Sequence, residues 1–249
     1  MAEAGDPARE VKRAPRRGKR EEKAGATREA LLKAAEEVVG EVGYANASIA
    51  LITQRAGVAQ GTFYNYFGSR QEILDALLPT LGKAMLNHIK KFALGGHSFA
   101  ELEEGSFRGF FDFLHNTPDF FRILIESDVF APKGTEEHFD TVSKQYVRFL
   151  RHSWANGEFP AFREDEMETI AFIFMSARAY LAKHYVFGEG GRTRLPEQVA
   201  ETYMKLVRFG LEGRMVDGGV PGKVAVGRKA PAAARAAVDA KVSRKRGAR

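Results

Sequence analysis

The chain of 249 residues contains no cysteine and only six histidines. Without cysteine it can form neither a disulfide nor a thiolate metal site, and the scattered histidines lack the spacing of a zinc-binding helix. The sequence patterns of serine hydrolases, metalloproteases and P-loop nucleotide-binding proteins are also missing. The glycines at 188–191 follow no predicted strand, so they are not a dinucleotide-binding loop. We therefore predict no metal, no cofactor and no enzymatic activity.

Long hydrophobic runs are missing as well. No apolar stretch approaches the roughly 20 residues that a membrane-spanning helix needs. The first residues are polar and basic and lead into no apolar segment, which argues against a secretory signal. Together with the lack of cysteine, these features predict a cytoplasmic protein that has no membrane partner.

Alternation of apolar and polar residues, the pattern of a half-buried strand, is not found either. Apolar residues instead recur every three or four positions from about Thr27 to about residue 213, which predicts an all-α fold. Ser69 and Glu72 have the spacing of a capping box, so a helix is expected over 69–92. Pro79 lies inside that segment and predicts a kink or a break there.

The formal charge of +6 is unevenly distributed along the chain. Residues 1–25 carry 8 basic and 5 acidic side chains, a net of +3, and residues 219–249 carry 9 and 1, a net of +8. The part between them has a net charge of −5. Both ends are poor in residues that could build a core. We therefore expect residues 1–24 and 217–249 to be disordered basic tails that suit a polyanion.

The stretch from Ser48 to Phe67, SIALITQRAGVAQGTFYNYF, is the most informative in the chain. Its apolar residues fit two short helices, one buried through Ile52 and the other through Phe63 and Phe67, with a tight turn at Gly57 between them. This is the geometry of a helix-turn-helix, in which the second helix lies in the DNA major groove. On spacing alone, an ordinary pair of packed helices is the alternative.

The exposed side of the predicted second helix carries groups with different abilities to contact DNA. Gln60 and Asn65 are amides, which suit the edge of an adenine base. Gly61 has no side chain, so the backbone can approach DNA closely there. Hydroxyl and guanidinium groups suit phosphate oxygens, and the candidates are Ser48, Thr62, Tyr64, Tyr66 and Arg70. The Ser48 hydroxyl can also cap the first helix.

An ordered set of residues in this region resembles the TetR family (TetR/AcrR type) of bacterial transcriptional regulators. The matching residues are Gly43-Tyr44, Ser48, Ile52, Ala56-Gly57-Val58, Gly61-Thr62, Phe63-Tyr64, Tyr66-Phe67, Ser69 and Leu74. The resemblance covers about 27–75 by motif and continues as an all-helical pattern of suitable length. The chain departs from the family at Ala59, where Ser or Thr often caps the recognition helix, and at Gln60, where Lys is frequent. These departures bear on the operator sequence and not on the fold.

The resemblance implies a three-helix helix-turn-helix DNA-binding domain (25–85) and a helical ligand-binding and dimerisation domain (86–216). The basic arm (1–24) and the basic tail (217–249) predicted from composition flank these two domains. It further implies a homodimer that binds a palindromic operator of double-stranded DNA, usually as a repressor, and that a small-molecule inducer releases. The last two helices usually form the dimer interface in this family. The apolar residues available for that interface are Ile170, Phe174, Ala177, Leu181, Met204, Val207 and Leu211, and the alternative is that they are simply core.

Phenylalanine is concentrated in the predicted ligand-binding domain, since 17 of the 19 lie between Phe92 and Phe209. Such a core could line an apolar pocket, so we expect an apolar or aromatic ligand, acyl chains included. The candidate ligand-binding residues are Phe110, His115, Phe121, Tyr146 and Arg178. For each one, burial in the core or an ordinary hydrogen bond is the alternative. For the whole chain, the alternative is a non-inducible architectural DNA-binding protein that uses its basic tails.

Overall fold

The computed structural model describes residues 15–187 and 193–211, and within these ranges every regular element is helical. The prediction of an all-α fold is therefore confirmed. The α-helices are α1 (Pro15–Asn46), α2 (Ile49–Ala56), α3 (Gln60–Phe63), α4 (Arg70–Phe92), α5 (Phe99–Asn116), α6 (Phe120–Phe130), α7 (Pro132–Ala155), α8 (Met167–Leu181) and α9 (Glu197–Leu211). A short 3₁₀ turn (Glu164–Glu166) precedes α8 and a π-helical turn (Ala182–Val186) follows it.

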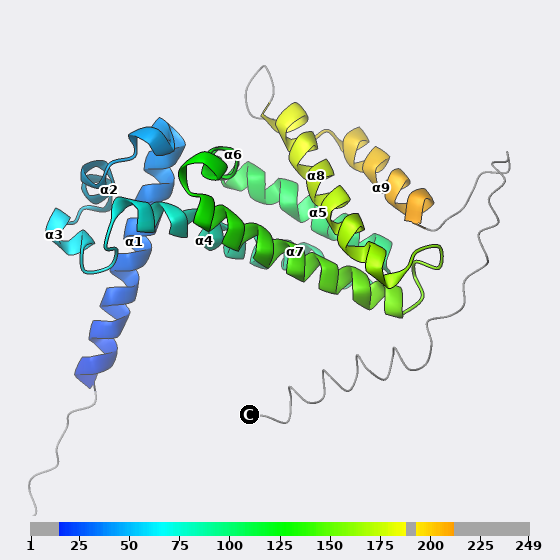
Figure 1. Ribbon diagram of the computed structural model, residues 1–249, viewed down its shortest axis with the longest axis horizontal. Helices are drawn as coiled ribbons and strands as arrows, with labels where there is room; N and C mark the ends of the chain where they lie inside the picture. Colours follow the sequence, from blue (N-terminus) through cyan, green and yellow to red (C-terminus); the bar gives the residue numbers. More distant parts are fainter. Residues whose placement is uncertain (1–14, 188–192, 212–249) are drawn as a thin grey trace, which may run out of the picture.

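The helices form two groups that α4 connects (Figure 1). Helices α1–α3 gather at one end of the molecule, and α4 leads from them into a bundle of α5, α7, α8 and α9. Helix α6 lies at the junction and packs against α1, α4 and α7. The predicted border between the two domains, at 85 and 86, falls inside α4. One continuous helix thus belongs to both groups, and we retain the division as a proposal.

The N-terminal helix is longer than the sequence predicted. Helix α1 begins at Pro15, so the prediction of disorder over 1–24 is wrong for residues 15–24. Thr27 does not begin a helix, because it lies within α1 and its Oγ1 donates a hydrogen bond to the Lys23 carbonyl oxygen (2.9 Å). Residues 1–14 and the predicted tail at 217–249 lie outside the described residues.

The end of α1 is marked by a change of backbone direction at Gly43. Its φ of 78° and ψ of 166° lie in a region that only glycine adopts easily. The regular helical dihedral angles of α1 are interrupted at this residue. Three more residues carry the chain through Tyr44 to Asn46, and Ser48 then begins α2.

Pro79 does not interrupt α4, which runs as one helix from Arg70 to Phe92. The proline leaves the Asp75 carbonyl without its helical donor, and α7 packs closely against that carbonyl at Gly134. A Cβ atom at Gly134 would lie 2.2 Å from the Asp75 oxygen. One turn further along, Gly82 leaves room for the buried imidazole of His138 from α7. Pro79 and Gly82 therefore let α7 approach the backbone of α4.

Candidate functional site

Helix α2 begins and ends as its sequence predicts. The Leu51 N–H donates to the Ser48 hydroxyl oxygen (3.2 Å), which caps the first turn. Gly57 ends the helix with a φ of 67°, in the left-handed conformation typical of a glycine C-cap. Ile52 from α2 and Phe63 from α3 are fully buried, so they fix the two helices against α1 and α4. The helix-turn-helix predicted from spacing is confirmed as a structure.

Helix α3 is shorter than predicted. Its regular part spans Gln60–Phe63, and hydrogen bonds from residue i+3 to residue i continue the coil as a turn through Tyr66. Ala59 precedes it and makes no side-chain cap, as expected for alanine. Because three-residue hydrogen bonding winds the chain more tightly than an α-helix, this segment brings Thr62 and Asn65 close to one another along one side.

The residues predicted to contact DNA form the outer surface of this short element. Gln60, Gly61, Tyr64 and Asn65 are exposed, and Thr62 and Tyr66 are half-buried. The Tyr64 side chain is 59% exposed, which is unusual for so large a ring. No other atom lies within 4 Å of where a Cβ atom at Gly61 would stand, so the backbone there is open to a partner. Contact with DNA remains a prediction for these residues.

Arg70 makes contacts that the sequence did not predict. Its half-buried guanidinium group donates hydrogen bonds to the carbonyl oxygens of Tyr44, Ala45 and Ala47. The first two of these carbonyls lie in the last residues of α1, and the third lies in the link to α2. Arg70 thus ties α4 to the end of α1, and its contact with a phosphate stays a prediction.

Another cation near the helix-turn-helix is also bound within the protein. Arg55, at the end of α2, donates to the carboxylate of Glu41 (2.7 and 2.9 Å) and to that of Glu37 (3.3 Å), both on α1. These contacts raise the pKa of the arginine and lower that of Glu41, so the arginine stays charged and its charge is compensated within the protein. Phosphate contacts from this surface would accordingly come from hydroxyl and backbone N–H groups.

Of the five predicted ligand-binding residues, Tyr146 and Arg178 are in direct contact. The Arg178 Nη2 donates to the Tyr146 hydroxyl oxygen (3.1 Å), and the guanidinium carbon lies 5.1 Å from the centre of the Tyr146 ring. Phe121 instead stacks on Phe187 beyond the end of α8 (4.2 Å between ring centres), and Phe110 is in the core beside Phe111. His115 is half-buried, and its Nδ1 has no hydrogen-bond partner in the described part of the chain.

A buried polar cluster surrounds Arg178, and Glu103 is at its centre. The Glu103 side chain is fully buried, and its carboxylate accepts hydrogen bonds from Arg178, Tyr146 and Tyr203, each at 2.6 Å. The Arg178 Nη1 donates to the Ser106 hydroxyl oxygen (3.2 Å). Burial raises the pKa of both tyrosines, which keeps their hydroxyls protonated as donors. The cluster joins α5, α7, α8 and α9.

Sequence reasoning missed Glu103 and Tyr203. Glu103 lies in the N-terminal part of α5. Its position in the sequence indicates a buried side chain, because it lies four residues after Phe99 and four before Phe107, on the apolar stripe of α5. A carboxylate on such a stripe must be buried, and a buried charge needs a partner.

Four of the seven residues predicted for the dimer interface face the interior of the protomer. Ile170, Phe174, Met204 and Val207 are buried within the protomer. Leu181 and Ala177 are half-buried, and the side chain of Leu211 lies outside the described residues. The large apolar side chains that are exposed on α8 and α9 are Phe172, Ile173, Tyr180, Leu206 and Phe209. They occupy the alternate face, and on α8 they border a shallow depression lined by Thr169, Phe172, Ile173, Ser176, Ala177 and Tyr180.

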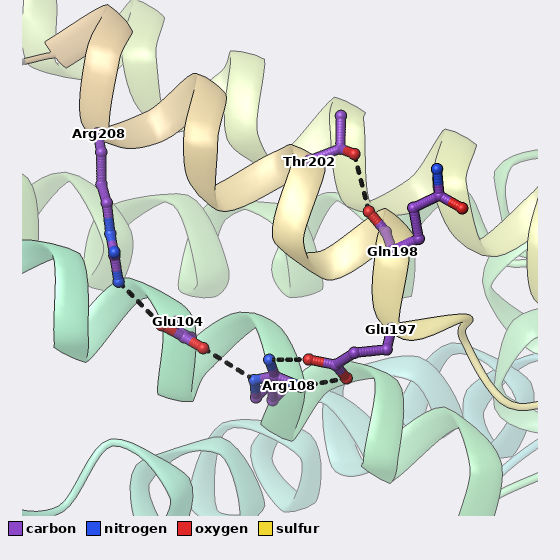
Figure 2. A network of polar contacts seen from close by, with 6 residues as sticks. All are labelled: Glu104, Arg108, Glu197, Gln198, Thr202 and Arg208. Atoms are coloured by element: carbon purple, nitrogen blue, oxygen red, sulfur yellow. Dashed lines mark hydrogen bonds and ion pairs between the residues drawn. The ribbon is translucent and has the colours of Figure 1, made fainter.

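Ion pairs at both ends attach α9 to α5 (Figure 2). Near the start of α9, Glu197 accepts hydrogen bonds from both terminal nitrogens of Arg108, one of them at 2.9 Å. Near its end, Arg208 donates to Glu104 (3.2 Å), which also accepts from Arg108 (3.1 Å). Between these pairs the Tyr203 ring stacks on Phe107, with 4.0 Å between ring centres. The outer side of α9, with Leu206, is thereby held in a fixed orientation.

Helix α6 joins the bundle to the DNA-binding end of the molecule. Arg122 donates to the carbonyl oxygens of Gly40 (2.9 Å) and Glu41 (3.1 Å) at the end of the regular part of α1. Its ion-pair partner Glu126 accepts the Tyr44 N–H (2.9 Å) just after the bend. The same helix contacts the bundle through the stacking of Phe121 on Phe187. A shift of α6 would therefore move the end of α1.

Two features bear on membranes and metals. None of the helices in the described ranges is both long enough and apolar enough to span a membrane. Among the same residues, no group of three or more histidine, aspartate or glutamate side chains is arranged to hold a metal ion.

Comparison with known proteins gives a consistent result. A sequence model of the family described as bacterial regulatory proteins, tetR family, matches residues 31–77. The uncharacterized HTH-type transcriptional regulator YvdT of Bacillus subtilis is 47% identical over 60 residues, which are 24% of this chain and 29% of YvdT. The chain therefore matches less than a third of that relative's length.

Solved structures share the fold over most of the chain. The fatty acid degradation regulator FadR from Bacillus halodurans superimposes with a TM-score of 0.61 and 19% identity, over 76% of this chain and 97% of FadR. FadR from Bacillus subtilis, solved with stearoyl-CoA, gives a TM-score of 0.63 and 17% identity, over 75% and 98%. The sequence match over α1, α2, α3 and the start of α4 shows that residues 31–77 resemble the N-terminal region of the tetR family of bacterial regulatory proteins, and the solved structures share the fold along the remaining helices.

Proposed function

We propose that this chain is a cytoplasmic, homodimeric repressor that binds a palindromic DNA operator and is released by an apolar small molecule. The observation that carries the DNA-binding part is the outer surface of α3, where amides, hydroxyls and an open glycine backbone stand together. The architectural alternative rests on the basic tails, most of which lie outside the described residues, and the α3 surface is better suited to reading a sequence.

In this proposal, α3 enters the major groove with Gln60 and Asn65 at base edges. Thr62, Tyr64 and Tyr66 supply hydroxyls for phosphate oxygens, which set the orientation on the duplex. Gly61 lets the backbone approach the DNA. Ser48 caps α2 and can contribute only through the hydroxyl hydrogen or a second lone pair, since one lone pair accepts from Leu51.

Gly61→Ala should separate DNA binding from folding. A Cβ atom there meets no protein atom within 4 Å, and alanine is the better helix former by up to about 1 kcal/mol. The variant should therefore be as stable as the native chain, or more stable, while its operator affinity falls about tenfold or more because the methyl group lies where DNA must approach. Urea unfolding and fluorescence anisotropy, with a duplex selected from a random library, measure the two effects.

The matched control is Gly25→Ala. Gly25 is also helical and also has open space at its Cβ position, but it lies in α1, away from α3. This variant should gain stability in the same way and keep the operator affinity of the native chain. If the Gly61→Ala variant kept its operator affinity, α3 would not be the helix that contacts the bases of the operator.

For the dimer, we propose that the exposed faces of α8 and α9 meet their counterparts in a second copy. A two-fold arrangement buries the same patch on both partners, and contiguous exposed apolar side chains commonly mark such a surface. Ile173 is 58% exposed and Leu206 is 71% exposed, so both would be covered by association. The polar contacts between α9 and α5 fix the orientation of Leu206 before the dimer forms.

Ile173→Asp should weaken dimerisation without unfolding the protomer. The substitution places a charge in an apolar contact, and an uncompensated charge in an interface is strongly unfavourable. We expect the dimer dissociation constant to rise by about 100-fold or more, as measured by sedimentation. Val129→Asp is the control, because Val129 is 75% exposed on α6, outside the proposed interface. Equal dissociation constants for the two variants would contradict this interface.

For the inducer, we propose a long apolar acyl compound. The interior between α5, α7, α8 and α9 is lined by aromatic rings and contains the polar cluster around Glu103 and Arg178. Such a lining favours an apolar body with one polar end. One FadR protein of the same fold is a fatty acid degradation regulator, and another, a transcriptional regulator, was solved with stearoyl-CoA. Entry of the ligand's acyl chain would displace aromatic rings of the bundle. Helices α4 and α6 would transmit this movement to α1.

A further inference from the structure

The helix-turn-helix domain has little positive charge of its own. Residues 25–85 carry 5 basic and 6 acidic side chains, a net of −1. Each of the five basic groups already has a partner within the chain, four of them carboxylates or carbonyl oxygens and one an aromatic ring. These groups are Lys33, Arg55, Arg70, Lys83 and Arg28. Since a DNA duplex carries one negative charge per about 1.7 Å of its axis, this domain contributes few cations that could neutralise it.

Positive charge is concentrated instead at the beginning of α1. Residues 15–24, the basic segment of α1, carry 5 basic and 2 acidic side chains, a net of +3. The segment is helical and continuous with the part of α1 that packs in the core from Leu31 onward. From Glu22 to Ala30 no residue is buried. At 1.5 Å per residue, residues 15–30 extend for about 24 Å, and Figure 1 shows this part of α1 projecting beyond α3.

The composition of the basic segment limits the kind of partner that it fits. Residues 16–26 contain no apolar side chain larger than alanine. An apolar groove on another protein, or a membrane surface, requires a helix with an apolar face. A helix that packs against nothing is marginally stable in water, and Gly18 and Gly25 weaken this one further. A polyanion is therefore the partner that would stabilise the segment.

Helical spacing places the cations of this segment together. Positions 16, 19, 20 and 23 are three or four residues apart and share one face of the helix. Gly25 is on the opposite face, so Gly25→Ala leaves that face unchanged. Directly after the segment, the guanidinium carbon of Arg28 lies 5.2 Å from the centre of the Phe67 ring, just beyond the coil that α3 begins. A duplex bound by α3 would therefore lie close to the basic face.

We propose that Arg16, Lys19, Arg20 and Lys23 bind backbone phosphates of double-stranded DNA beside the bases that α3 reads. The basic segment does so as a rigid helical continuation of α1. The inference rests on the proposed DNA-binding function and assigns its salt-dependent part to α1. Reading of the bases and neutralisation of the phosphates would thus belong to different helices.

The test is a full-length variant in which all four of these residues are replaced by glutamine. Its affinity for the selected operator, and for a duplex of scrambled sequence, is measured by anisotropy from 50 mM to 1 M KCl. Each lost phosphate contact reduces the slope of log affinity against log salt by about 1, so the slope for a dimer should fall by about 4 to 8. At 100 mM KCl the affinity should fall about 100-fold or more, and near 1 M it should approach that of the native protein.

A second fourfold variant controls for the change in net charge. It replaces four exposed cations of the bundle, on α4 and α7, by glutamine: Lys90, Lys91, Lys144 and Arg148. Charges more than a Debye length from the duplex are screened, about 10 Å at 0.1 M salt, so this variant should keep the native slope. An equal reduction of the slope in both variants would show that net charge, and not the basic segment, determines the salt dependence.

Ala24→Pro tests whether the segment must be helical. It keeps every charge, but a proline inside a helix removes one backbone hydrogen bond and clashes with the carbonyl four residues earlier, at Arg20. The operator affinity at 100 mM KCl should fall about tenfold, while Gly25→Ala keeps the native affinity. Native affinity in Ala24→Pro would overturn the rigid helical continuation.

The outcomes distinguish this inference from the proposed function. Native slopes in the first fourfold variant, or an affinity lowered by the same factor at every salt concentration, would overturn the phosphate contacts. Binding of phosphatidylglycerol vesicles together with native slopes on DNA would assign the segment to a membrane surface. If the native protein prefers no duplex to the scrambled one, the reading of an operator by α3 is wrong, and the slopes on the scrambled duplex still test the basic segment.

Discussion

Arg178→Met should lower the free energy of unfolding by about 3–5 kcal/mol, because removal of one partner of a buried ion pair leaves the other charge uncompensated. Here the stranded group is the Glu103 carboxylate, which is 0% exposed and has no other cation among its hydrogen-bond partners. Methionine retains the side chain as far as the position of Nε, so the substitution removes the charge together with the packing of the guanidinium group. Urea unfolding, followed by the fluorescence of the single tryptophan, Trp154, measures the change.

A double variant serves as the control for charge rather than packing. With Glu103→Leu added to Arg178→Met, the stranded carboxylate disappears, and most of the lost stability should return. Arg108→Met provides a second comparison, because its ion pair with Glu197 is at the surface and should contribute below about 1 kcal/mol. If the Arg178→Met and Arg108→Met variants were equally stable, Glu103 would not depend on Arg178 for its charge balance.

The parts of the fold that the sequence predicted are those determined by neighbouring residues. Ser48 and Ser69 cap helices because each hydroxyl accepts an N–H three residues later, at Leu51 and Glu72. Gly57 ends α2 because only local backbone geometry is involved. The same applies to Ala59, whose inability to cap α3 follows from its own side chain. The helix-turn-helix is built from such short-range rules, so it could be predicted without a structure.

The contacts that the sequence did not predict join residues that are distant in sequence. Arg70 was expected at a phosphate, but its acceptors are more than 20 residues away, at Tyr44 and Ala47. The Arg178 and Glu103 pair spans 75 residues. Neither pairing leaves a periodic pattern, so it cannot be inferred from helical spacing alone.

Another reason accounts for the residues of the predicted dimer interface that are buried in the protomer. Helix α8 carries apolar residues on two faces, and a sequence cannot tell which face meets the core of its own chain. Ile170 and Phe174 were chosen for the interface, but they pack inward, and Ile173 takes the outward position one residue before Phe174. A helix that is apolar on nearly all sides is expected to be buried on both faces. Which face packs within the protomer and which is left for a second copy depends on the tertiary fold.

Gly43→Ala should lower the free energy of unfolding by about 2–3 kcal/mol, since a side chain is strained in this backbone region and also meets a neighbour. At a φ of 78° and ψ of 166° an L-residue is poorly tolerated. In addition, a Cβ atom at this position would lie 2.7 Å from the Nη2 of Arg122. The arginine would have to leave the carbonyl oxygens of Gly40 and Glu41, so the substitution would also loosen α6 from α1.

The consequence for function follows from where this bend lies. Residues 44–47 lead from it directly into the cap of α2, so a changed bend should reorient the helix-turn-helix and reduce operator affinity by about tenfold or more. Gly25→Ala, in the same helix but with helical dihedral angles and open space, should instead gain up to about 1 kcal/mol and keep its operator affinity. Unfolding in urea and anisotropy with the selected operator, applied to both variants, distinguish strain at the bend from a general effect of alanine in α1. Should Gly43→Ala lose stability and still bind the operator with native affinity, the contact of α6 with α1 would support folding alone and could not transmit a ligand-induced movement.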